Sequence, residues 1–168
     1  MNLGLAGKVA LITGGSKGIG FATALLMAKE GAKVAICARG KEHLRAAAQR
    51  IKEESGAGDV LPIAADVMKQ EECERAVQET VNRFGRLDIL VNNAGTAAGR
   101  PFEEISTEAW RQDLDLKLFG AIHCSRAAIP HMRAAGGGAI VNLTAVGGKT
   151  PGASSMPSSV SRAAGLAL

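Results

Sequence analysis

A glycine-rich segment near the N-terminus strongly limits what this chain can fold into. It reads Thr13-Gly-Gly-Ser-Lys-Gly-Ile-Gly20 and ends a nearly continuous apolar run, Lys8 to Thr13, which is typical of a strand buried on both faces of a parallel sheet. Helical spacing of apolar residues follows, from about Gly18 to Lys29. Between a strand and a helix, small residues let backbone N–H groups and the helix N-terminus approach a pyrophosphate. This context predicts a dinucleotide-binding turn; the alternative is a purely structural glycine turn.

Strand and helix patterns alternate along the rest of the chain. Further strands are predicted at 34–38, 60–65, 87–91 and 139–143, and further helices at 41–54, 73–84, 107–133 and 158–168. Such alternation predicts an α/β fold, a Rossmann-type doubly wound parallel sheet. A length of 168 residues fits one domain, 1–168, better than two.

Composition and charge argue against several other classes of protein. The net charge is +4, but Lys and Arg alternate with Glu between Lys41 and Glu54, which indicates a solvated helix surface and not a nucleic-acid site. Cys37, Cys73 and Cys124 are odd in number and widely spaced, so they suggest neither a disulfide framework nor a metal site. No apolar run is long enough to span a membrane, and no export signal is visible. We therefore expect a cytoplasmic protein without metal, nucleic-acid or membrane partners.

The end of the second predicted strand indicates which dinucleotide is bound. NAD-binding folds usually place an acidic residue here, against the ribose hydroxyls, but this chain has Cys37-Ala38-Arg39. Arg39 offers a planar fork for a 2′-phosphate, and Lys17 adds a second cation on the same side. The pair predicts NADP(H), although either cation alone can be a solvated surface charge.

Two more motifs follow at strand ends, Asp66-Val67 and Asn92-Asn-Ala-Gly95. Together with the glycine-rich segment, and in this order, they resemble the motifs of the short-chain dehydrogenase/reductases, and the resemblance extends from Lys8 to Leu168. It implies hydride transfer between a nicotinamide and a carbonyl or alcohol, in a dimer or tetramer. The residues that it places along NADP(H) are Gly14, Ser16, Lys17, Gly18, Ile19, Gly20, Arg39, Asp66, Val67, Asn93, Ala94, Gly95 and Arg162.

The same resemblance fails where the family does its proton chemistry. The family uses a Tyr, assisted by a Ser, a Lys and an Asn, whereas the corresponding positions here are Ser158, Ala145, Arg162 and Lys117. The sequence contains no Tyr at all. An aliphatic hydroxyl is a far weaker acid than a phenol, whose pKa is about 10, so Ser158 is a poor substitute. Arg162 can hold the nicotinamide ribose, but it cannot share a proton as Lys does.

Lys117 is the one new titratable group near the expected reaction centre. A desolvated Lys beside another cation can have a lowered pKa, so Lys117 is a candidate proton donor. The alternative is that its side chain reaches solvent from the surface of a long helix. By position, the candidate catalytic residues are therefore Lys117, Ser158 and Arg162.

Two functions remain open from the sequence. One is an NADP(H)-dependent oxidoreductase acting on a small carbonyl, alcohol or polarised double bond. The other is a catalytically silent NADP(H)-binding protein, either a sensor or the partner subunit of an active paralogue. The chain ends at Leu168 within an apolar helical run, whereas members of the family continue through two more strands and a substrate-covering loop. We therefore expect a fragment of a longer protein.

Overall fold

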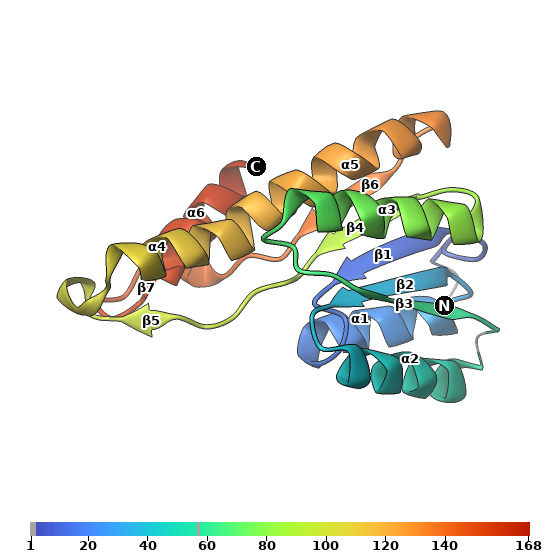
Figure 1. Cartoon of the computed structure of the whole chain (residues 1–168), viewed down its shortest axis with the longest axis horizontal. Coiled ribbons are helices and arrows are strands. Elements are labelled where there is room, and N and C mark those ends of the chain that lie inside the picture. Colours follow the sequence, from blue (N-terminus) through green and yellow to red (C-terminus); the bar gives the residue numbers. More distant parts are fainter. Residues whose placement is uncertain (1–2, 57) are drawn as a thin grey trace.

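Five parallel strands form the central sheet of the molecule (Figure 1), in the order β3-β2-β1-β4-β6. The computed structural model describes residues 3–56 and 58–168. The strands are β1 (Val9–Thr13), β2 (Lys33–Ala38), β3 (Val60–Ala64), β4 (Ile89–Asn92) and β6 (Ala139–Asn142). The strand order changes direction between β1 and β4, and this confirms the predicted doubly wound sheet.

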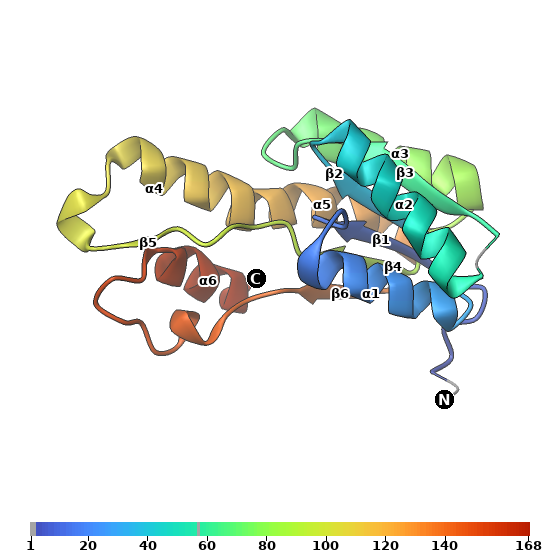
Figure 2. The ribbon, with the colours of Figure 1, turned by 90° about the horizontal axis from the view of Figure 1, so that it is seen from below.

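Two helices cover each face of this sheet (Figures 1 and 2), namely α1 (Gly18–Lys29) and α2 (Lys41–Ser55) on one side, and α3 (Gln70–Phe84) and α5 (Gly120–Ala134) on the other. Side chains of β1 alternate between the two cores. Val9 and Leu11 pack in the core under α3 and α5, whereas Ala10 and Ile12 pack in the core under α1 and α2. Because both faces are covered, every residue of β1 is buried, and its sequence is a nearly continuous apolar run.

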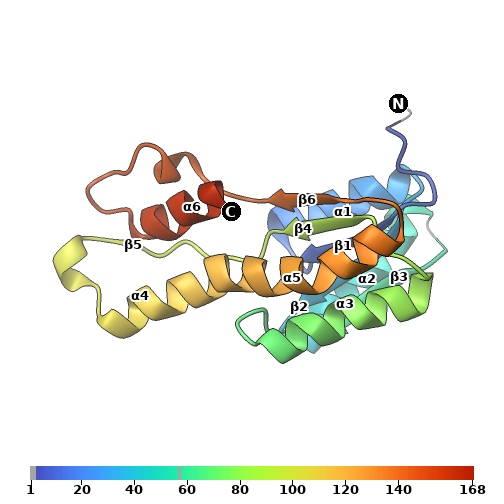
Figure 3. The same ribbon diagram turned by 90° about the horizontal axis from the view of Figure 1, so that it is seen from above.

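The long helix predicted at 107–133 consists of three segments in the structure. They are α4 (Thr107–Leu114), a π-helical turn (Asp115–Phe119) and α5, which extends to Ala134. Figure 3 shows them as one long rod that crosses the sheet and projects beyond it. A π-helical turn widens the helix locally and shifts the residues that face the sheet. Lys117 lies in the middle of this turn.

A small lobe lies beyond the carboxyl ends of the sheet strands (Figure 1), and the sequence predicted only its helices. It contains α4, α6 (Ser158–Ala167) and an antiparallel pair, β5 (Gly99–Arg100) with β7 (Met156–Pro157). Strands of two residues have no periodicity that a sequence pattern can detect. The lobe is completed by two short 3-10 turns, at Phe102–Glu104 and Val146–Gly148.

The described residues contain no disulfide, no candidate metal site and no membrane-spanning helix. Cys37, Cys73 and Cys124 are free and buried. Among residues 3–56 and 58–168, no group of His, Cys, Asp and Glu is arranged to hold a metal ion. No helix in those ranges combines the length and apolarity needed to cross a bilayer.

Candidate active site

A cleft of about 1700 Å³, open to solvent, runs along the carboxyl edge of the sheet. Its lining comes from the loops after β1, β2, β3 and β4, with contributions from the π-helical turn, the β6 loop and α6. Every residue expected from the sequence to contact NADP(H) lines this cleft, with the exception of Gly20. The fold thus brings together segments that are up to 148 positions apart, from Gly14 to Arg162.

The glycine loop between β1 and α1 has the geometry of a phosphate cradle. Gly14 and Gly18 adopt φ angles of 65° and 57°, which disfavour any residue with a side chain. A Cβ atom on Gly18 would meet nothing within 4 Å, so the backbone of α1's first turn faces open space. Backbone N–H groups exposed there can bind phosphate oxygens. The residues present therefore fit the phosphates of a dinucleotide.

Gly20 packs against the buried side of the same loop. It is buried, and a Cβ atom there would lie 2.4 Å from both the Asn93 side-chain nitrogen and the Gly14 carbonyl oxygen. Gly20 therefore does not line the cleft, because it lies beneath the glycine loop. Its missing side chain lets α1 approach the ends of β1 and β4.

Thr13 and Asn93 join the glycine loop to the loop after β4. The buried Thr13 hydroxyl accepts hydrogen bonds from the backbone N–H groups of Asn93 and Ala94, both at 3.0 Å. In return, the Asn93 side chain donates to the carbonyl oxygens of Thr13 at 2.8 Å and Gly14 at 3.1 Å. Thr13 opens the glycine motif, but no sequence signal marks it as a residue of the site. Asn93 lines the cleft, but its amide is used to fix the loop.

Two cations border one end of the cleft. Lys17 precedes α1 and Arg39 follows β2, and both are exposed. Neither has a carboxylate within ion-pair distance in the described part of the chain. At the turn after β3, Asp66 lines the cleft and accepts a hydrogen bond from the Met68 N–H at 3.1 Å. Lys17 and Arg39 are thus free to bind an anionic group there.

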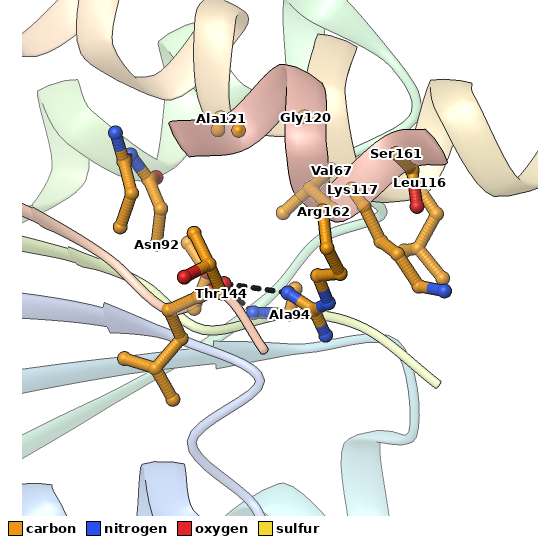
Figure 4. Close-up of a pocket in the computed structure, with 14 residues that line it drawn as sticks. Val67, Asn92, Ala94, Leu116, Lys117, Gly120, Ala121, Thr144, Ser161 and Arg162 are labelled. Atoms are coloured by element: carbon orange, nitrogen blue, oxygen red, sulfur yellow. Dashed lines mark hydrogen bonds between the residues drawn. The ribbon is translucent and has the colours of Figure 1, made fainter. Parts of the chain in front are cut away.

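A smaller pocket of about 390 Å³ adjoins the other end of the cleft (Figure 4), where Arg162 and Lys117 lie next to each other. Arg162 donates a hydrogen bond to the Leu143 carbonyl oxygen at 2.5 Å, and burial lowers the pKa of its guanidinium. A Cβ atom on Gly95 would lie 2.8 Å from a terminal nitrogen of Arg162. The guanidinium therefore lies against the loop after β4, which is the loop that borders the dinucleotide cleft.

Lys117 is buried, which overturns the alternative that its side chain reaches solvent. Its side chain is only 1% exposed, and its ammonium donates hydrogen bonds to the Asp113 carboxylate and, at 2.7 Å, to the Ser158 hydroxyl. Burial lowers the pKa of Lys117; the charge and hydrogen bond of Asp113 oppose this shift, while the charge of Arg162 adds to it. The direction agrees with the one expected for a desolvated Lys beside another cation.

Ser158 receives two hydrogen bonds at its side-chain oxygen. One comes from Lys117 and the other from the backbone N–H of Ala98, at 3.1 Å. Thr144 lines both the cleft and the smaller pocket, whereas its neighbour Ala145 lines neither. The structure thus brings Lys117, Ser158 and Arg162 close together.

The fold and these motifs place the chain in a known family. The short chain dehydrogenase family matches residues 8–168, and the protein belongs to it. An 11-beta-hydroxysteroid dehydrogenase of Pinus massoniana is 41% identical over 144 residues, which are 85% of this chain and 40% of that protein. L-sorbose reductase of Gluconobacter frateurii, solved with NADPH and L-sorbose, is 39% identical with a TM-score of 0.95, and the match covers 99% of this chain and 63% of that one.

A third relative is an NAD+-bound xylitol dehydrogenase, 30% identical with a TM-score of 0.92, in which the match covers 97% of this chain and 62% of that one. The chain thus spans between two fifths and two thirds of the length of these relatives. Since the two solved relatives were obtained with different dinucleotides, the shared fold does not select between NAD and NADP.

Proposed function

We propose that this protein is an NADP(H)-dependent oxidoreductase that transfers a hydride between the nicotinamide and a small carbonyl or alcohol. The observation that carries this proposal is a cleft with two free cations at one end and, at the other, the pocket lined by Lys117 and Arg162, where Lys117 donates a hydrogen bond to Ser158. The bound nicotinamide would supply the hydride chemistry. L-sorbose reductase, whose structure holds NADPH, supports the choice of dinucleotide.

Each group of residues has a distinct role in this proposal. The glycine loop and the first turn of α1 would hold the pyrophosphate through backbone N–H groups. Lys17 and Arg39 would bind the 2′-phosphate, which NAD lacks. Arg162 would hold the nicotinamide ribose. Ser158 would exchange a proton with the substrate oxygen, and Lys117 would supply that proton to Ser158.

Cofactor preference is tested by comparing dissociation constants for NADPH and NADH. Arg39→Asp removes the fork and introduces repulsion, so we expect NADPH binding to weaken by about 10-fold or more, since a hydrogen bond to a charged group contributes about 1.5–3 kcal/mol. NADH binding should be unchanged or improved. Arg45→Asp is the matched control, because Arg45 is exposed on α2 and lines no part of the cleft. Equal NADPH and NADH affinities, unaltered by Arg39→Asp, would contradict the preference.

Turnover is tested by single-turnover oxidation of bound NADPH against aldehydes, ketones and enones. Oxidation of NADPH by any of them supports the proposal. Lys117→Met should slow this oxidation and abolish the fall in its rate at high pH. Tight NADPH binding without oxidation would instead identify a silent cofactor-binding protein.

We also propose that the 168 residues form one domain that acts on a small molecule, in the cytoplasm, as a dimer or tetramer. The three free thiols support a reducing compartment. Sedimentation of the purified chain across a range of concentrations tests the oligomeric state.

A further inference from the structure

An acidic residue that the sequence motifs do not single out is hydrogen-bonded to Lys117, one of the candidate catalytic residues. Asp113 belongs to α4 and is 5% exposed, one helical turn before Lys117. One of its carboxylate oxygens accepts a hydrogen bond from Lys117, and the other accepts one from Ser161 of α6 at 2.6 Å. Asp113 therefore links α6, which carries Ser158 and Arg162, to the π-helical turn that carries Lys117.

Charge balance explains why an acid is needed at this place. Lys117 and Arg162 are two cations in a partly desolvated pocket, and the charge of Arg162 adds to the burial that lowers the pKa of Lys117. Burial of an unpaired charge is costly, so a buried Lys without a carboxylate tends to become neutral. Asp113 is the carboxylate that opposes this, and its hydrogen bond to Lys117 keeps the ammonium form favoured.

The hydrogen bonds at Ser158 determine where its own proton can go. The Ser158 oxygen already accepts from the Lys117 ammonium and from the Ala98 N–H. A hydroxyl has one donor and two acceptor lone pairs, so the O–H of Ser158 is left to donate to a third group. A substrate oxygen is the group that the proposed reaction would bring to this side chain.

From these contacts we propose that Asp113 is a positioning residue, which keeps Lys117 protonated and aimed at Ser158, so that Lys117 and Ser158 form a proton relay that replaces the missing tyrosine. The inference rests on the proposed reductase function. In the reduction, bound NADPH would supply a hydride to the carbonyl carbon, which would leave an alkoxide oxygen. The alkoxide takes the proton of Ser158, and Ser158 takes a proton from Lys117. Neutral Lys117 would then be reprotonated by water in the pocket that it lines, which adjoins the open cleft.

Asp113→Asn separates this role from a merely structural one. The Asn side chain has nearly the same shape, but it lacks the negative charge, so the pKa of Lys117 should fall by about 1 unit or more. Since reduction requires the ammonium, the loss of kcat at high pH should begin at a correspondingly lower pH. At pH values above the midpoint of the wild-type profile we expect kcat to fall about 10-fold, with the KM for NADPH unchanged within about 2-fold. Asp115→Asn is the matched control, because Asp115 lies two residues further along, at the start of the π-helical turn.

Two further measurements keep the test decisive. The pKa of Lys117, measured by NMR on the side-chain carbon next to its nitrogen, does not depend on turnover. If this pKa and the pH profile are the same in Asp113→Asn and the wild type, Asp113 has no positioning role. If Asp113→Asn does not fold, the double variant Asp113→Leu with Lys117→Met removes both charges; it should fold and bind NADPH but lose reduction, and unimpaired reduction by it would overturn the relay.

The result also distinguishes this inference from the proposed function. A wild-type chain that binds NADPH but oxidises it with none of the carbonyl compounds would overturn the reductase function, and the relay with it. A chain that reduces carbonyl compounds with the same pH profile in the wild type and Asp113→Asn would overturn the inference alone.

Discussion

At the scale of single residues, the absence of a side chain matters as much as its presence. Gly20→Ala would place a methyl group 2.4 Å from two polar atoms, one of them in the backbone of Gly14. Overpacking of this kind usually costs about 1–3 kcal/mol. We expect the free energy of unfolding to fall by that amount, and NADPH binding to weaken because the glycine loop must move. Chemical denaturation and a binding titration measure the two effects.

Gly165→Ala provides the control for this substitution, because a methyl group there would meet its nearest neighbour at 3.7 Å, an ordinary contact distance. A Gly20→Ala protein with wild-type stability and wild-type NADPH affinity would show that α1 does not need this close approach.

The changed catalytic positions also depend on one another. Lys117 could not be buried as an ammonium without Asp113, and Asp113 could not be buried as a carboxylate without Lys117 and Ser161. Substitution of either residue alone would therefore leave the other as an uncompensated buried charge.

At the scale of elements, the contact between the ends of β1 and β4 sets the geometry of the cleft. Thr13→Val keeps the shape of the side chain but removes the oxygen that accepts two backbone N–H groups. An unsatisfied buried donor costs about 1–3 kcal/mol. We expect a loss of at least that size in the free energy of unfolding, together with weaker NADPH binding, measured by denaturation and by fluorescence titration.

Thr13→Ser retains the hydroxyl and serves as the control, with stability much closer to that of the wild type. If Thr13→Val and Thr13→Ser were equally stable and bound NADPH equally well, the two loops would not be held by this hydroxyl.

At the scale of the whole molecule, the cofactor cleft and a buried ionic cluster occupy opposite edges of the sheet. Asp88 is 3% exposed at the amino ends of the strands, where it accepts hydrogen bonds from Arg86 and from the Val9 N–H at 2.9 Å. Burial raises the pKa of Asp88, but these hydrogen bonds and the charges of Arg86 and Lys8 outweigh it, so the net shift is downward.

This lowered pKa predicts how stability depends on acid. A carboxyl group with a lowered pKa in the folded state contributes stability above its unfolded pKa of about 3.9, and the contribution is lost as pH falls through the folded value. Asp88→Asn should therefore cost about 1–3 kcal/mol at neutral pH and flatten the acid limb of the stability curve below about pH 4. NADPH affinity should not change, since Asp88 is far from the cleft lining. Urea unfolding between pH 3 and pH 7 checks this; an acid limb identical to that of the wild type would refute it.

Much of the fold was predictable from local patterns. Continuous apolar runs, such as the one before Thr13, predicted the strands, because a strand buried on both faces requires them. Periodic apolar spacing predicted the four covering helices, and the cofactor motifs lie in the loops between these elements. The predicted ends of helices and strands differ from those in the structure by a few residues; for example, α3 begins at Gln70 and not at Cys73. The short strands β5 and β7 had no detectable signal, since two residues cannot display a period.

The sequence by itself determined the parallel sheet and the family to which this chain belongs, together with the positions that line the cleft. Only the tertiary structure decided the states of the polar groups at the reaction centre. Whether Lys117 is solvated or buried depends on α6, 41 residues further along the chain, which brings Ser158 to its ammonium and Ser161 to Asp113. The energy of a buried charge is set by the partners that surround it in space, and no local pattern of residues contains them.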